Sequence, residues 1–127
     1  MSLQPDFAIA ADRERLSAAD IVRAVTARKL SALDVTEAAL ARIARYDQVL
    51  NSFTDVTADR ARAKARAVDA AIATGKNPGP LAGVPFAVKN LFDVRGLPTR
   101  AGSRINREEP QPACGAHGRA FSVCNCR

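Results

Sequence analysis

The chain has 127 residues, of which 47% are hydrophobic and 25% charged, a composition typical of one globular domain and not of a disordered or fibrous chain. The formal net charge is +6, from 19 lysines and arginines and 13 acidic residues spread over the whole length. This even spread, with one tyrosine and no tryptophan to stack on bases, argues against specific nucleic-acid binding.

Residues 1–15, MSLQPDFAIAADRER, form a polar lead-in without periodicity. They lack the basic segment followed by an apolar run that a secretory signal needs. No apolar run in the chain approaches the ~20 residues that span a bilayer. We therefore expect a cytoplasmic protein that has no membrane contact.

Two helix-capping signals follow. Ser17-Ala-Ala-Asp20 resembles a capping box, and Ser31-Ala-Leu-Asp34 repeats the same pattern. They predict two helices joined by a tight turn, over residues 17–28 and from Ser31 to about Tyr46. The segment Asn51–Val56 alternates polar and apolar residues, which predicts a short strand or extended link.

A third helix is predicted over Ala58–Thr74, which is rich in helix formers. Gly75 is predicted to end it. Its thin apolar stripe suits close packing on a sheet better than a membrane contact, because the stripe is poor in large side chains. The stripe consists of Ala61, Ala65, Val68 and Ile72.

The stretch Leu81–Ser103 brings a lysine to the end of an apolar run. Val84–Val88 contains one proline near its start, which predicts a buried strand that begins at a loop. Lys89 follows at or just past the strand end. A buried lysine must be paired, neutralised or functional, whereas the ordinary alternative is a solvated lysine.

Around this lysine the sequence resembles the amidase signature family of amide hydrolases and amidotransferase A subunits. The resemblance covers residues 16–106. Asn90 and the Phe92-Asp93-Val94 ending resemble the branch that acts on carboxybiuret-type and other small ureide substrates. The most specific matching segments are PLAGVPFAVKNLFDV at 80–94, GLPT at 96–99 and AGS at 101–103.

The resemblance implies an α/β fold, an incomplete α/β/α sandwich with a mixed sheet, of which residues 1–106 are the N-terminal portion. It implies a Ser, cis-Ser, Lys triad in which Lys89 is the lysine, and no cofactor or metal. Neutral lysine accepts a proton through the bridging serine as the nucleophilic serine attacks the amide carbonyl. The implied partners are a small amide or ureide substrate in the complete enzyme, and a second copy or a small protein subunit.

The two serines of the family's triad belong to glycine- and serine-rich motifs downstream of the lysine. This chain contains no Gly-Gly-Ser-Ser run, and its serines lack that context. We therefore expect a truncated amidase-signature hydrolase that holds one of three catalytic residues and is inactive by itself.

Two polar residues flank the lysine region. Asp93 could orient Lys89, but an aspartate at a junction between strand and loop more often caps a turn. Asn90 follows the lysine directly, and the same structural use applies to it.

The character of the chain changes after Asn106. Four soft ligands suffice for a structural zinc, but the spacing in the tail matches no standard zinc motif. We interpret residues 107–127 as an aberrant, disordered tail from out-of-frame translation, which sequencing of the gene would test. The alternative is a small basic protein whose tail binds a metal or a partner. The candidate ligands are Cys114, His117, Cys124 and Cys126.

Overall fold

The structure is a computed structural model that describes residues 16–103 and 122–126. The three strands form one mixed sheet in the order β1-β3-β2, with β3 antiparallel to β1 and parallel to β2. The predicted α/β class and mixed sheet are confirmed. The elements are α2 (Ala18–Thr26), α3 (Ala32–Leu50), β1 (Phe53–Val56), α4 (Ala58–Ala73), β2 (Phe86–Lys89) and β3 (Ser122–Cys126).

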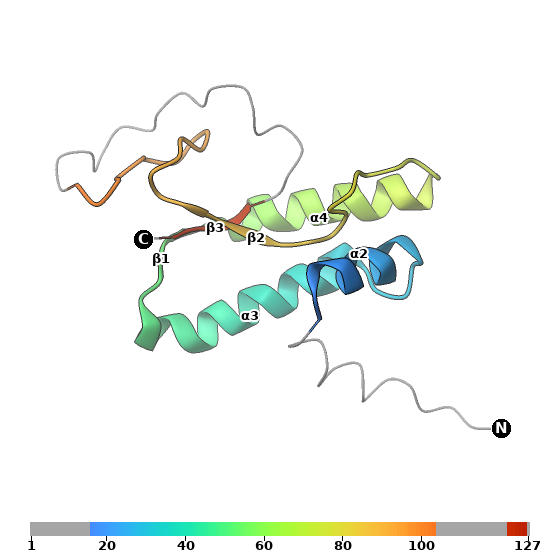
Figure 1. The fold of residues 1–127 in the computed structure, drawn as a ribbon, viewed down its shortest axis with the longest axis horizontal. Helices are drawn as coiled ribbons and strands as arrows, with labels where there is room; N and C mark the ends of the chain where they lie inside the picture. Colours follow the sequence, from blue (N-terminus) through green and yellow to red (C-terminus); the bar gives the residue numbers. More distant parts are fainter. Residues whose placement is uncertain (1–15, 104–121, 127) are drawn as a thin grey trace.

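Helices α3 and α4 lie side by side, with α2 beside the N-terminal end of α3 (Figure 1). Both α3 and α4 also contact β3, the central strand. The apolar stripe of α4 packs against α2 and α3 as well as the sheet. Its alanine side chains are small, so the helices can approach closely. One core cluster consists of Val25, Leu30, Ala32, Val35, Ala65 and Ile72.

Helix α2 begins with the predicted capping box. The Ser17 hydroxyl accepts a hydrogen bond from the Asp20 amide, and the Asp20 carboxylate accepts from the Ser17 amide at 3.1 Å. The hydrogen bond from Ser17 and the ion pair with Arg23 together lower the pKa of Asp20. Since both partners are present in the first turn, the sequence signal located this helix start correctly.

Helix α3 runs four residues past the predicted end at Tyr46. It ends at Leu50 because Asn51 adopts a left-handed conformation, with φ of 50°. The Asp47 carboxylate then accepts hydrogen bonds from the amides of Ser52 and Phe53, at 2.6 and 3.3 Å. This local contact turns the chain from the helix into β1.

Helix α4 and its end agree with the prediction. Gly75 has a φ of 73°, the left-handed conformation that glycine adopts without strain after a helix. Arg28, in the loop after α2, donates from its guanidinium to the Ile72 carbonyl at 2.7 Å. One of the last carbonyls of α4 is therefore satisfied by a residue distant in the sequence.

Strand β3 comes from the segment that we interpreted as a disordered tail. Its backbone lies between β1 and β2, with Phe53 opposite Cys126 and Lys89 also opposite Cys126. Each pairing contains one irregularity in its register. Residues 104–121 and 127 lie outside the described residues, so the remainder of the tail prediction stays a prediction.

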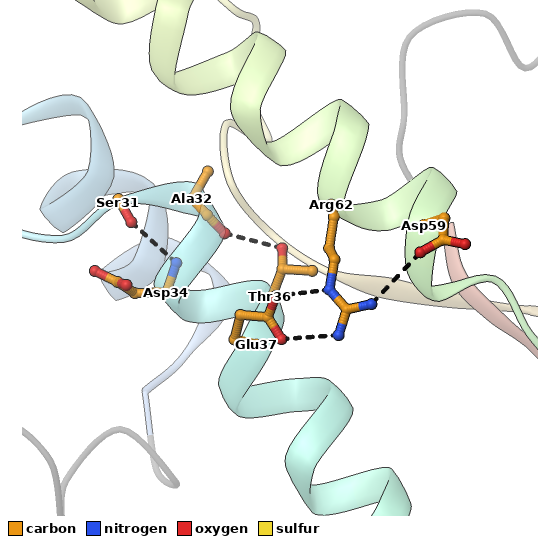
Figure 2. Close-up of polar contacts among 7 residues, drawn as sticks. All are labelled: Ser31, Ala32, Asp34, Thr36, Glu37, Asp59 and Arg62. Atoms are coloured by element: carbon orange, nitrogen blue, oxygen red, sulfur yellow. Dashed lines mark hydrogen bonds and ion pairs between the residues drawn. The ribbon is translucent and has the colours of Figure 1, made fainter.

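The start of α3 is capped from α4 in a way that the sequence did not reveal. The Ser31 hydroxyl accepts from the Asp34 amide at 2.9 Å, as Figure 2 shows. In addition, the carboxylate of Asp69 accepts from the amides of Ala32 and Leu33, at 2.7 and 3.1 Å. A carboxylate at this position satisfies two free amides and interacts favourably with the helix dipole.

Replacing Asp69 by alanine is expected to lower the free energy of unfolding by about 1 to 2 kcal/mol, because two amides lose their acceptor. Urea unfolding followed by circular dichroism measures this loss. Asp59→Ala is the matched control, since the Asp59 side chain is fully exposed and its ion pair with Arg62 is 3.6 Å long. The control is expected to change stability by less than about 0.5 kcal/mol. Equal losses in both variants would contradict the capping role.

An exposed ion pair joins α3 to α4. Arg62 donates from Nε and Nη2 to the two carboxylate oxygens of Glu37, at 2.7 and 3.1 Å (Figure 2). The hydrogen bond from Arg62, and then the positive charges of Arg62 and Arg66, lower the pKa of Glu37. The same contact raises the pKa of Arg62.

Because the pKa of Glu37 is lower in the folded state, its contribution to stability is complete above the ordinary glutamate value of 4.5. This contribution is expected to disappear as the pH falls from that value through the lower folded pKa. Urea unfolding between pH 7 and pH 3 checks this, with Glu37→Gln as the comparison. If Glu37→Gln retains the full pH dependence of the wild type, the ion pair does not contribute.

Candidate functional site around Lys89

Strand β2 places Lys89 on a face that the described part of the chain leaves open. Phe86 and Val88 are half-buried, whereas Ala87 and Lys89, which point to the opposite face, are exposed. The prediction of a buried strand was therefore wrong for this face of β2. The physical reason is that the helices of the described residues leave it uncovered.

The chain reaches β2 through a close contact with the helices. Gly83 has a φ of 75°, and a Cβ at this position would lie 2.9 and 3.0 Å from the two methyl groups of Val25. Val25 is itself 1% exposed. Because only a residue without a side chain fits here, the segment before β2 is held tightly against α2 and the start of α3.

The residue after Lys89 is a buried hydrogen-bonding centre. Asn90 is 4% exposed. Its amide nitrogen donates to the Thr54 hydroxyl on β1 at 2.8 Å, and its amide oxygen accepts from the Arg100 amide at 2.6 Å. Its own carbonyl accepts from the Ala101 amide at 2.8 Å. Asn90 thus connects the end of β2 to β1 and to the returning loop.

Further contacts hold the loop after Lys89. The Arg100 guanidinium pairs with the Asp55 carboxylate on β1, at 3.3 Å. The Thr99 hydroxyl donates to the Asp93 carboxylate at 2.7 Å. Of the two interpretations of Asp93, the contact with Thr99 supports the structural one, in which the aspartate closes a turn.

The ammonium group of Lys89 makes no hydrogen bond or ion pair with any residue in 16–103. Of the serines in this range, Ser17 and Ser31 act as helix caps. The residues around the lysine thus offer one candidate proton acceptor, Lys89, at the end of a paired strand.

Residues 34–116 match the amidase family. The chain belongs to the amidase signature family. The match begins within the first turn of α3, includes Lys89 and Asn90, and ends ten residues beyond the predicted boundary at Asn106.

Two named relatives of this chain come from different enzymes. It is 50% identical to the AtzE subunit of the 1-carboxybiuret hydrolase from Pseudomonas sp. (strain ADP) over 91 residues, which are 72% of this chain and 20% of the relative. It is 48% identical to the A subunit of the glutamyl-tRNA(Gln) amidotransferase from Acidothermus cellulolyticus over 94 residues, 74% of this chain and 19% of the relative. The chain thus spans about a fifth of the length of these curated relatives.

Two solved structures share the fold. A structure described as a vestigial protein complex that reveals the origins of an s-triazine catabolic enzyme is 46% identical, with a TM-score of 0.73 over 76% of this chain and 21% of that chain. A bacterial aryl acylamidase of the amidase signature family is 28% identical, with a TM-score of 0.79 over 87% and 25% of the two chains.

The described residues contain no metal cluster and no membrane-spanning helix. Within residues 16–103, no group of three or more histidine, cysteine or acidic side chains could hold a metal ion. Cys114 and His117 lie outside the described residues, and for Cys124 and Cys126 only the backbone of β3 is described. In the same described part, no helix is long and apolar enough to cross a membrane.

Asn90 is the residue of this site whose importance sequence reasoning missed. The sequence places it beside the lysine, but its contacts reach Thr54, 36 residues earlier, and Arg100, ten residues later. The Asp55–Arg100 ion pair spans 45 residues. Pairings at such separations leave no periodic signal in a single sequence, so only the folded chain reveals them.

Proposed function

We propose that this chain supplies the lysine-bearing part of an amidase-signature hydrolase that cleaves the C–N bond of small amides or ureides. In this proposal Lys89 is the base of a Ser, cis-Ser, Lys triad. The position of Lys89 carries the proposal: it ends β2 inside the family match and lies on an open face, where another segment of an enzyme can reach it. Covering that face would favour neutral lysine, the form that accepts a proton.

The relatives support the substrate class and a partner. One relative is named as a subunit of 1-carboxybiuret hydrolase and the other as a subunit of an amidotransferase. Small ureides or amides, and an assembly with a second protein, therefore belong to the proposal. A homo-oligomer is the alternative assembly. The cytoplasmic location stays a prediction, because residues 1–15, on which it partly depends, lie outside the described residues.

A chimaeric enzyme tests the proposal. Residues 16–106 of this chain replace the corresponding segment of the AtzE subunit of the Pseudomonas 1-carboxybiuret hydrolase, to which this chain is 50% identical over 91 residues. We expect the chimaera to hydrolyse 1-carboxybiuret, measured as ammonia release, because the matched segment supplies the lysine and its support. A chimaera that melts like the parent enzyme but releases no ammonia would contradict the proposal.

The 127-residue chain alone is expected to release no ammonia from ureides or simple amides. Amide hydrolysis requires a nucleophile, a base and an oxyanion site in one cavity that excludes water. Lys89 is exposed in the described part of the chain, so no cavity that excludes water surrounds it there. The same ammonia assay measures this, and turnover by the isolated chain that Lys89→Ala abolishes would show that no further segment is needed.

A further inference from the structure

Asn90 stands out among the buried polar groups. In the described part of the chain, two polar side chains are buried, those of Thr36 and Asn90. The Thr36 hydroxyl donates to the Ala32 carbonyl of its own helix at 2.9 Å, so a local contact explains it. The contacts of Asn90 all lead to other segments. A buried amide costs free energy unless its groups are paired, so these contacts determine where the residue can sit.

The contacts also determine which way the amide faces. Its oxygen accepts from the Arg100 amide, and its nitrogen donates to the Thr54 hydroxyl. Half a turn of the amide would place its NH₂ group against the N–H of Arg100, two donors facing each other. The side-chain amide of Asn90 therefore joins β1 to the loop after β2 in one orientation of the amide.

Lys89 depends on this connection. Its ammonium makes no hydrogen bond or ion pair within residues 16–103, so its own side chain does not tether it. Its backbone is paired with β3, and the next residue in the chain is Asn90. The Asp55–Arg100 ion pair closes a second link between the same two segments. The backbone position of Lys89 is therefore set by the pairing with β3 and by the contacts of Asn90.

We propose that Asn90 is a positioning residue for Lys89: by joining Thr54 on β1 to the amide of Arg100, it sets where Lys89 leaves the sheet. The importance of this role for catalysis rests on the proposed function. The positioning of Lys89 by Asn90 does not rest on the proposed function, and it is tested without an activity assay.

The probe is Lys89 itself, in the 127-residue chain after reductive ¹³C-methylation of its amines. The methyl NMR signal of Lys89 is identified by its loss in Lys89→Arg. Hydrogen exchange of the backbone amides of Lys89, Arg100 and Ala101 is measured on the same protein. The other lysines serve as internal references: Lys29, Lys64 and Lys76.

In Asn90→Ala we expect the Lys89 signal to move toward that of an unstructured lysine. The three amides are expected to exchange on the order of tenfold faster, while amides in the middle of α3 change less. Asn77→Ala is the matched control. Asn77 is exposed, and among the described residues its side chain accepts from the nearby Gly79 amide alone, so Lys89 should be unaffected.

Two further variants keep the test decisive if Asn90→Ala does not fold. Thr54→Val removes the hydroxyl that accepts from Asn90 and is expected to reproduce the shift, whereas Thr54→Ser retains the hydroxyl and the wild-type signal. A lower melting temperature with an unchanged Lys89 signal and unchanged local exchange would overturn the proposal and leave Asn90 a purely structural role. If the chimaera is inactive but these shifts occur, the proposed function fails and the positioning role stands.

Discussion

Replacing Lys89 by alanine in the chimaeric hydrolase is expected to lower ammonia release on the order of a thousand-fold. A positioned base contributes about 10² to 10⁴ to the rate of such a reaction, and alanine cannot accept a proton. The melting temperature should change little, because the Lys89 side chain makes no hydrogen bond or ion pair within residues 16–103. Ammonia release at saturating 1-carboxybiuret, with a melting curve for each variant, measures both effects.

Two variants separate the chemistry of Lys89 from its charge. Lys89→Arg keeps a positive charge of similar reach but cannot lose its proton, so we expect it to be as inactive as Lys89→Ala. Lys76→Ala removes another exposed lysine, in the loop after α4, and should leave the rate unchanged. Substantial activity in Lys89→Arg would contradict a role as base and indicate that only the charge is needed.

Replacing Gly83 by alanine is expected to lower the free energy of unfolding by about 2 to 5 kcal/mol. The left-handed φ of 75° costs a residue with a side chain about 1 to 2 kcal/mol. The new methyl group would also meet Val25 and, at 3.3 Å, the Cβ of Ala32, and overpacking of this kind costs about 1 to 3 kcal/mol. Against a net stability of about 5 to 15 kcal/mol, this loss brings the chain close to unfolding. Urea unfolding measures it.

Gly75 provides a matched control that separates the cost of the left-handed backbone from the cost of overpacking. Its φ of 73° equals that of Gly83 within a few degrees, but a Cβ there would meet nothing within 4 Å. Gly75→Ala should therefore show the backbone cost alone, about 1 to 2 kcal/mol. In a double-mutant cycle, Val25→Ala should reduce the cost of Gly83→Ala, because the clashing methyl groups are gone. Equal costs at Gly83 and Gly75 would contradict the packing argument.

Local signals predicted the elements well. Ser17 and Ser31 marked the starts of α2 and α3, and Gly75 marked the end of α4, because caps and left-handed residues act within a few positions of themselves. The end of α3 was predicted four residues early. Its last turn adds no buried side chain to the core, since the apolar residues there are exposed, and the true stop depends on the left-handed conformation of Asn51.

The sequence by itself determined the family, the helices and the place of Lys89 at a strand end, since these depend on short motifs and on local backbone preferences. Only the tertiary structure decided that Asp69 caps α3 and that Asn90 joins β1 to the loop after β2. It also decided that one face of β2 is exposed. These features result from contacts between residues distant in the chain, and from which surfaces the neighbouring elements cover. Neither the contacts between distant residues nor the coverage of a surface can be predicted from the spacing of residues along a single segment.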